Sequence, residues 1–214
     1  MTKNALFSFN EHFNYIAVAG NIGAGKTTLT RRLSEDLRIQ PFFEPVKENP
    51  YLEDFYGDME RWSFHLQVFF LSERFKAQAQ IQKESIWCVQ DRTIYEDIEV
   101  FARTQHLLGA MNERDFATYS TLSENIVPFL RLPRKLIYLK ASVSRLIERI
   151  RARNRDYEQE IDPDYLETLN IHYNQWVDKF SNLVDTVVVD IDKVDLNENA
   201  EEYKRLINNL SSLF

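Results

Sequence analysis

A short glycine-rich segment that ends in a lysine and threonines carries the clearest chemistry of the chain. It fits the pattern G-x-x-x-x-G-K-[ST] without a mismatch, and its residues are Gly20, Asn21, Ile22, Gly23, Ala24, Gly25, Lys26, Thr27 and Thr28. In such a loop, backbone N–H groups close around phosphate oxygens, and the N-terminus of the next helix adds a favourable dipole. The lysine reaches the β- and γ-phosphates, and the first threonine hydroxyl holds magnesium. The segment predicts a site for a nucleoside triphosphate with Mg²⁺, and the weaker alternative is a turn that binds nothing.

The sequence on both sides of this loop supports the same interpretation. Residues 15–19 form a short apolar run with β-branched residues, as in a buried parallel strand. After the loop, Leu29, Leu33 and Leu37 recur on one side of a predicted helix. A strand, a phosphate loop and a helix therefore follow one another in the required order.

Two carboxylates are predicted at the ends of neighbouring strands, beside the phosphate loop. Glu44 and Asp91 each close a short apolar run. One of them can accept a proton from an attacking hydroxyl while the other holds magnesium, directly or through water. Arg92 follows at once and can stabilise a transferring phosphate or hold the carboxylates. The competing interpretation is that both acids are solvated and that Arg92 only pairs with Asp91 or Glu96.

Short apolar runs alternate with helical stretches along the chain, as in an α/β protein. This spacing implies right-handed crossovers and a parallel sheet, with functional sites at the C-terminal ends of the strands. A helix over about 112–127, ended by Pro128, is also expected. The five predicted strands are residues 15–19, 40–44, 86–90, 135–139 and 186–190.

An aromatic stretch over residues 60–83 predicts a long helix with Asp58 as its N-cap. Gln67 and Arg74 are polar positions within it, and seven residues of separation place them within about 20° of one face. A buried amide and guanidinium need partners, so this face carries either an internal network or a polar ligand. Glutamine can bind the N6/N7 edge of adenine with two hydrogen bonds. Asp97 is available as a counter-charge for Arg74.

A basic cluster follows the fourth predicted strand and precedes the acidic segment 156–160. Four-residue spacing places three of its arginines on one helix face. In phosphoryl transfer, lid arginines neutralise the charge on the γ-phosphoryl oxygens, so we favour a lid over a solvated helix face. The cluster consists of Arg145, Arg149, Arg151, Arg153 and Arg155.

Length and charge narrow the class of protein. A chain of 214 residues fits one domain, or one domain with a lid. The net charge of −7 argues against a general nucleic-acid binder, because such binding depends on neutralising phosphates. No apolar run approaches the ~20 residues that span a bilayer, and residues 1–14 lack the apolar stretch of a signal peptide. A single cysteine fits a reducing compartment. We therefore expect a cytoplasmic protein with no nucleic-acid or membrane partner.

Together these residues resemble the deoxyribonucleoside kinase family over nearly the whole chain. The resemblance implies a P-loop kinase-like, three-layer α/β fold with a five-stranded parallel sheet flanked by helices. It implies a single domain over residues 1–214, with an arginine-rich lid at about 150–162. The implied reaction is transfer of the γ-phosphoryl of ATP to the 5′-hydroxyl of a deoxyribonucleoside. The residues that carry the resemblance are the phosphate loop, Glu44-Pro45-Val46, Tyr56 ahead of Glu60-Arg61-Trp62-Ser63-Phe64, Gln67, Arg74, Asp91-Arg92, Asp97 and the lid ending in Glu158.

The same resemblance implies roles on the acceptor side of the site. Glu44 would lie near the 5′-hydroxyl as proton acceptor, while Asp91 either takes that role or serves magnesium. Tyr56 and Glu158 would hold the 3′-hydroxyl and leave no room for a 2′-hydroxyl. Arg92 would act with the two acids. The base would be recognised by Gln67, Arg74 and Asp97.

Further roles concern the donor and the assembly. Arg149 and Arg153 would hold the donor phosphates, together with Lys26. The stretch 190–195, with Asp192 and Lys193, would lie near the adenine of the donor. The two long helices would pair across a homodimer, so the implied partners are ATP, a deoxynucleoside and a second copy of the chain.

The base preference is expected to be purine, with adenine ahead of guanine. Asn49 stands where animal relatives often carry a tryptophan, which weakens a pyrimidine preference. The stretches 49–52 and 91–97 look like those of bacterial deoxyadenosine kinases. A carboxylate at Asp97 can accept from a 6-amino group, whereas Arg74 could donate to a 6-oxo group.

Two other functions fit parts of the sequence. A nucleoside monophosphate kinase, such as a thymidylate kinase, would need cationic residues for the acceptor phosphate, and Arg74 or Arg92 could supply them. A guanine-nucleotide switch would account for the D-x-x-G match at residues 54–57. However, no apolar strand precedes that match, and the sequence contains no N-K-x-D for guanine selection.

Overall fold

The sheet is five-stranded and all-parallel, with strand order β2-β3-β1-β4-β5. This computed structural model describes residues 12–46, 48–84, 86–196, 198–211 and 213, so most of the N-terminal stretch used in the signal-peptide prediction lies outside it. All five predicted strands are present in the predicted order. They are β1 (His12–Gly20), β2 (Gln40–Phe42), β3 (Cys88–Asp91), β4 (Leu132–Lys140) and β5 (Asp185–Asp190).

The strand ends differ from the prediction at the second strand. Strand β2 ends at Phe42, so Glu44 lies two residues beyond it rather than closing it. Asp91 is the last residue of β3, as predicted. In the register, Val18 of β1 lies opposite Asp91, and Gly20 lies opposite Leu139 of β4. The phosphate loop therefore starts where β1 leaves β3.

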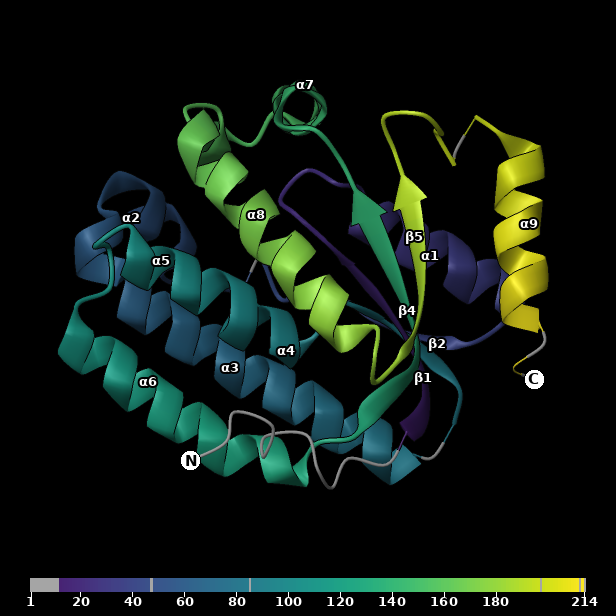
Figure 1. The fold of residues 1–214 in the computed structure, drawn as a ribbon, viewed down its shortest axis with the longest axis horizontal. Coiled ribbons are helices and arrows are strands. Elements are labelled where there is room, and N and C mark those ends of the chain that lie inside the picture. Colours follow the sequence, from purple (N-terminus) through teal and green to yellow (C-terminus); the bar gives the residue numbers. More distant parts are fainter. Residues whose placement is uncertain (1–11, 47, 85, 197, 212, 214) are drawn as a thin grey trace.

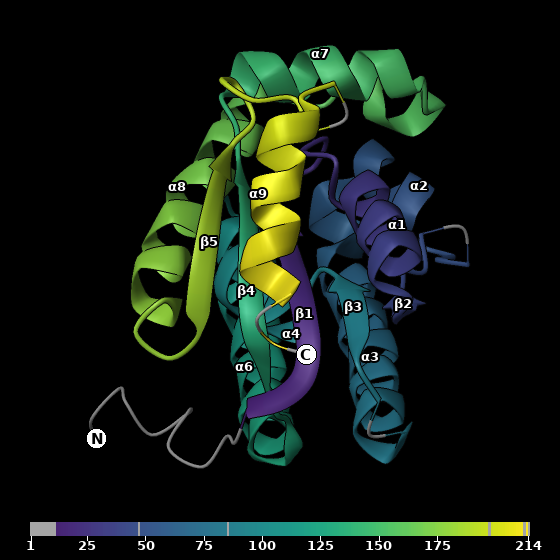
Figure 2. The ribbon, with the colours of Figure 1, turned by 90° about the vertical axis from the view of Figure 1, so that its right-hand side faces the viewer.

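Helices cover both faces of the sheet. Figure 1 shows α1 and α9 on one face and α3, α6 and α8 on the other. Figure 2 shows α7 lying across the upper ends of the strands. The helices are α1 (Lys26–Leu37), α2 (Leu52–Gly57), α3 (Met59–Glu84), α4 (Ile94–Glu96), the π-helix η2 (Asp97–Ala102), α5 (Arg103–Leu107), α6 (Glu113–Ile126), the 3₁₀ turn η3 (Val127–Phe129), α7 (Val143–Arg153), the 3₁₀ turn η4 (Asp156–Glu158), α8 (Pro163–Phe180) and α9 (Ala200–Ser211).

The two long helices begin where their sequences predict. Asp58 precedes α3, and its Oδ1 accepts a hydrogen bond from the backbone N–H of Arg61 at 3.0 Å. Asn112 caps α6 by accepting from the N–H of Asp115. Such side-chain acceptors satisfy N–H groups that have no partner within the helix. Pro128 falls in the 3₁₀ turn that follows α6.

Burial follows the apolar pattern of the sequence. Residues 15–19 of β1 have no exposed surface. Leu29 and Leu33 of α1 are buried against the same core. Helix α3 buries Leu66 and Phe70 but leaves Phe75 partly exposed. Strand β1 is thus buried on both faces, and the phosphate loop continues directly from this central strand of the sheet. Among the described residues, no helix combines the length and apolarity that a membrane crossing requires.

Candidate active site

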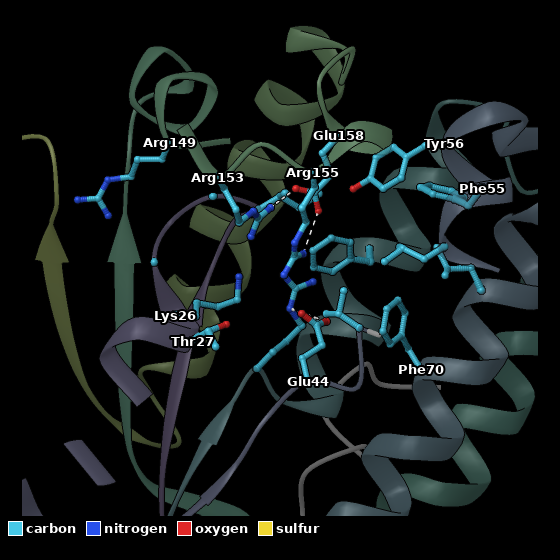
Figure 3. A pocket seen from close by; sticks show the side chains of 18 of the residues that line it. Lys26, Thr27, Glu44, Phe55, Tyr56, Phe70, Arg149, Arg153, Arg155 and Glu158 are labelled. Atoms are coloured by element: carbon cyan, nitrogen blue, oxygen red, sulfur yellow. Dashed lines mark hydrogen bonds and ion pairs between the residues drawn. The ribbon is translucent and has the colours of Figure 1, made fainter. Parts of the chain in front are cut away.

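A cavity of about 550 Å³ opens at the C-terminal ends of the strands, between the phosphate loop, α2, α3 and the segment after α7. Figure 3 shows its lining side chains converging from these separate parts of the chain. Its size suits a small-molecule site. The residues predicted for the site that line this cavity are Ile22, Gly23, Gly25, Lys26, Thr27, Thr28, Glu44, Tyr56, Gln67, Arg92, Asp97, Arg149, Arg153 and Glu158.

The phosphate loop has the backbone that its glycines predict. Gly25 precedes α1 with φ 94°, a left-handed conformation that side chains rarely adopt. Gly23 also has positive φ, and a Cβ there would lie 2.8 Å from Ile150 Cγ1 and 2.9 Å from Leu146 O. Helix α7 therefore packs directly on the loop at a position where only glycine fits.

Lys26 is almost fully buried at the start of α1. Its Nζ donates to Asn21 O at 2.9 Å, on the opposite side of the same loop. Burial lowers the pKa of Lys26 to about 8, and the neighbouring charge of Arg92 contributes, against the opposite effect of Asp91 and Glu44. A phosphate bound beside this buried ammonium group would therefore stabilise its charged form.

Asp91 faces the hydroxyl of Thr27. Thr27 Oγ1 donates to Asp91 Oδ2 at 2.5 Å, while Asp91 Oδ1 is buried without a hydrogen-bond partner. Burial raises the pKa of Asp91 above its ordinary value. A hydroxyl and a carboxylate beside a phosphate loop are oxygen ligands of the kind that Mg²⁺ prefers alongside nucleotide phosphates. These two residues fit a magnesium ion, although no group of three or more His, Cys, Asp or Glu residues that could hold a metal occurs in the described chain.

Glu44 is held between two arginines. Arg74 Nη2 donates to Glu44 Oε1 at 2.7 Å, and Arg92 Nε lies 3.5 Å from the same oxygen. Burial alone would raise the pKa of Glu44, but the charges of Arg92 and Arg74 outweigh it and lower the pKa to about 2. Glu44 is therefore an ionised carboxylate with a fixed orientation at neutral pH.

Arg92 adopts an unusual backbone conformation directly after β3. Its φ is 66°, and its N–H donates to Val18 O at 3.0 Å. Its guanidinium lies 4.1 Å from the centre of the Phe101 ring, a cation–π contact. A non-glycine residue with positive φ is uncommon and stores strain. With this backbone conformation, the Arg92 side chain lines the cavity and lies near Glu44.

The far end of the cavity is lined by Gln67 and Asp97. Gln67 Oε1 is buried without a hydrogen-bond partner. Arg74 Nε donates to Asp97 Oδ2 at 2.9 Å, which confirms the predicted counter-charge. Burial raises the pKa of Asp97 to about 6, with Arg74 opposing it. Arg74 itself does not line the cavity, because both Asp97 and Glu44 hold its guanidinium behind the wall.

Tyr56 and Glu158 face one another in the lining of the cavity. Figure 3 shows their oxygens pointing toward one another, with Arg153 and Arg155 beside Glu158. Both arginines form ion pairs with the Glu158 carboxylate. The ring of Tyr157 stacks on Tyr56, with centroids 5.6 Å apart. The segment predicted as a lid therefore contacts α2 through an aromatic pair.

Of the residues predicted to bind the phosphoryl donor, some line the cavity and others do not. Arg149 lines the cavity, donates to Ala24 O at 3.4 Å and pairs with Asp195 at 2.9 Å. Asp192 does not line it, because its carboxylate accepts from the backbone N–H and hydroxyl of Ser142 at the start of α7. Lys193 also lies outside the cavity, where it pairs with Asp190.

Two lining residues belong to predicted segments: Arg155 to the arginine cluster of the lid, and Asp195 to the stretch 190–195 expected near the donor adenine. Other lining residues were assigned no role from sequence. Phe70 lies three residues after Gln67, so helical spacing could have identified it. Phe55 and Tyr165 gave no comparable signal, because they approach the cavity from helices distant in sequence.

Comparison with known proteins identifies this arrangement. The family model described as deoxynucleoside kinase matches residues 16–214. The chain belongs to the deoxynucleoside kinase family. It is an ATP-dependent deoxynucleoside kinase, which confirms the leading hypothesis over a monophosphate kinase or a nucleotide switch.

The relatives of this deoxynucleoside kinase are named after different deoxynucleosides. The chain is 38% identical over 200 residues to a deoxyadenosine/deoxycytidine kinase of Bacillus subtilis (strain 168), with 92% of each chain covered. It is 40% identical over 173 residues to a deoxyadenosine kinase of Dictyostelium discoideum, covering 81% of this chain and 70% of that one. It is 31% identical over 206 residues to a deoxyguanosine kinase of Bacillus subtilis (strain 168), with 93% and 97% covered.

Solved structures show the same architecture. A deoxyadenosine kinase from M. mycoides with the products dCMP and a flexible dCDP bound has a TM-score of 0.83 at 32% identity. That match covers 92% of this chain and 99% of the other. The α/β fold with five parallel strands is thus the P-loop kinase fold expected from sequence. The names of the relatives include three different bases, so the base preference of this kinase has to be argued from its own cavity.

Proposed function

We propose that this kinase transfers the γ-phosphoryl of ATP to the 5′-hydroxyl of deoxyadenosine in preference to other deoxynucleosides, with Mg²⁺, in nucleotide salvage. One observation carries the proposal. The cavity joins the phosphate loop at one end to a buried glutamine and aspartate at the other. A nucleoside can therefore extend from the Gln67 end and present its 5′-hydroxyl near Glu44.

The base preference follows from the donors and acceptors at the Gln67 end. The side-chain amide of Gln67 offers one acceptor and one donor group. Adenine presents a matching amino donor and ring-nitrogen acceptor, whereas the O6 and N7 of guanine are both acceptors. Asp97 adds a second acceptor for an amino group. Cytosine shares the amino-donor pattern, so deoxycytidine is the strongest competitor.

The sugar would lie between Tyr56 and Glu158. Their polar oxygens point toward one another (Figure 3), so both can bind a 3′-hydroxyl placed between them. Phe55 and Phe70 occupy the adjacent wall. A 2′-hydroxyl placed there would have to displace packed side chains, which supports selection of deoxyribose over ribose.

The reaction requires positioning and charge neutralisation more than covalent participation by the protein. Glu44 is the proposed proton acceptor for the 5′-hydroxyl. Thr27 and Asp91 would hold magnesium, which neutralises charge on the phosphates when it is bound. Lys26 and Arg153 would contact the transferring phosphoryl group.

A phosphorylation screen with the four deoxynucleosides plus adenosine tests the substrate proposal. We expect deoxyadenosine to exceed deoxyguanosine in kcat/KM by about 10-fold, because guanine presents an oxygen, rather than an amino donor, to the Asp97 carboxylate. We expect adenosine to be about 10-fold poorer than deoxyadenosine because of the sugar site. A preference for deoxyguanosine, or for adenosine over deoxyadenosine, would contradict the proposal. Deoxyadenosine monophosphate as acceptor serves as the control for the class of kinase.

The buried ammonium group of Lys26 predicts a pH dependence for the donor step. Lys26 has a pKa of about 8 and binds phosphate in its charged form. The kcat/KM for ATP should therefore be constant below pH ~8 and fall about 10-fold for each pH unit above it. The measurement is the pH profile of kcat/KM for ATP at saturating deoxynucleoside. Lys26→Arg keeps its charge in this range, so it should lower the whole profile and abolish the alkaline fall. Persistence of that fall in the variant would assign it to another group.

Helices α3 and α6 are also proposed to pair with their copies in a homodimer. They pack against each other and leave Phe75 and Leu122 partly exposed, and Phe129 just after α6 is largely exposed. Exposed apolar side chains gathered on neighbouring helices are typical of an interface. The mass of the protein in solution is the quantity that tests this pairing.

A further inference from the structure

The phosphate loop is hydrogen-bonded to helix α8 through Asn21. Asn21 Nδ2 donates to the backbone carbonyl of Leu166 at 3.0 Å and to Asn170 Oδ1 at 2.9 Å. Asn170 Nδ2 donates in turn to Ala141 O at 3.0 Å. Ala141 lies between β4 and α7. One side-chain amide on α8 therefore links the phosphate loop to the segment from which α7 starts.

Asn21 also determines where the ammonium group of Lys26 lies. Its backbone carbonyl accepts from Lys26 Nζ at 2.9 Å and from the N–H of Ala24 at 3.2 Å. Its side-chain Oδ1 accepts from the N–H of Ile22 at 2.7 Å. Because every polar group of the Asn21 side chain is used, rotation of this residue would disturb the loop and the lysine together.

A second connection from α8 holds the preceding residue of the loop. The Glu96 carboxylate accepts from the N–H of Gly20 at 3.3 Å and from the hydroxyl of Tyr173 at 2.9 Å. Glu96 has no exposed surface. Tyr173 follows Asn170 by three residues and so shares its helix face. Two consecutive loop residues are therefore held, directly or through Glu96, by one face of α8.

We propose that Asn170 is a positioning residue for Lys26, acting through Asn21. It fixes the Asn21 side chain, so that the carbonyl of Asn21 holds the lysine ammonium where the donor phosphates bind. This inference rests on the proposed role of Lys26 in donor binding. Asn170 does not line the cavity, so its effect on the reaction is indirect.

The chemistry of the amide explains why asparagine suits this position. Its oxygen accepts from Asn21 while its nitrogen donates to Ala141, so both ends of the group are used. Leucine has nearly the same shape but can make neither bond. Asn174 supplies a matched control one turn further along α8: it is exposed, and its Oδ1 accepts from the Tyr138 hydroxyl at 3.3 Å, away from the loop.

The test compares Asn170→Leu with Asn174→Leu in steady-state kinetics with ATP and deoxyadenosine. We expect Asn170→Leu to lower kcat/KM for ATP by about 10-fold, the effect of losing one or two ordinary hydrogen bonds. The KM for deoxyadenosine should stay within about 2-fold of the wild-type value, since the acceptor end of the cavity is untouched. Asn174→Leu should leave both parameters unchanged. Asn170→Ala is the second variant, should leucine prevent folding.

A double-variant cycle separates positioning from a structural role. If Asn170 acts through Asn21, Asn170→Leu should have almost no further effect on kcat/KM for ATP in an Asn21→Ala background. Full multiplication of the two single effects would overturn the proposal, as would equal losses for ATP and deoxyadenosine. Each effect is the ratio of a variant's kcat/KM for ATP to that of the wild type. The outcome for Asn170 therefore does not depend on which deoxynucleoside the substrate screen shows to be preferred.

Discussion

Replacing Glu44 with glutamine is expected to lower kcat by about 10²- to 10⁴-fold, the usual contribution of a positioned general base. Glutamine has the same shape and can still accept a hydrogen bond from Arg74, which donates to Glu44 at 2.7 Å in the native site. Nucleoside binding should therefore be largely retained while proton transfer is lost. Single-turnover kinetics together with equilibrium binding of deoxyadenosine measure the two quantities separately.

Asp91→Asn is the matched comparison for this variant. If Asp91 serves magnesium through its contact with Thr27, its substitution should raise the Mg²⁺ concentration needed for half-maximal activity. Glu44→Gln should leave that concentration unchanged. Near-normal turnover by Glu44→Gln would transfer the role of base to Asp91. Its pKa is raised by burial, which would make it the stronger base of the two.

Replacing Arg153 with glutamine is expected to lower kcat by about 10³-fold, the lower end of the range for an arginine that stabilises phosphoryl transfer. Arg153 lines the cavity, and Figure 3 shows it on the same side of the site as Lys26, beside Glu158. The substitution removes a charge that would neutralise the γ-phosphoryl oxygens. Glu158 keeps its ion pair with Arg155, so the KM for the deoxynucleoside should change by only a few-fold. Steady-state kinetics in both substrates provide the measurement.

The control for this effect lies two residues away. Arg151 is exposed on the same helix and does not line the cavity, so Arg151→Gln should leave kcat within about 2-fold of wild type. A loss confined to KM for ATP in Arg153→Gln would show that this arginine binds the donor without stabilising the transition state. Equal losses of kcat in Arg153→Gln and Arg151→Gln would show that the effect comes from the overall charge of α7 and not from Arg153 in particular.

The sequence alone determined the features that depend on local spacing. The phosphate loop needs glycines at set positions to adopt positive φ and to let α7 approach. Its motif thus predicted that a helix begins at Lys26 and Thr27, and both residues line the cavity. Short apolar runs predicted all five strands. The clearest is β1, because a strand buried on both faces must be continuously apolar. The capping side chain of Asp58 predicted the start of α3, whereas the cap that Asn112 provides for α6 was found only in the structure.

Only the tertiary structure decided which of the polar residues face the cavity. Arg74 and Gln67 share one helix face, yet Arg74 lies behind the wall because Glu44 and Asp97 reach it from two other segments. Asp192 was predicted beside the donor but binds the start of α7. A polar side chain on a helix or loop has several partners within reach, and burial forces it to take the one that packing brings closest. Spacing along the sequence tells on which face of a helix or end of a strand a side chain lies. Which partner it then bonds depends on the segments that the tertiary fold brings next to it.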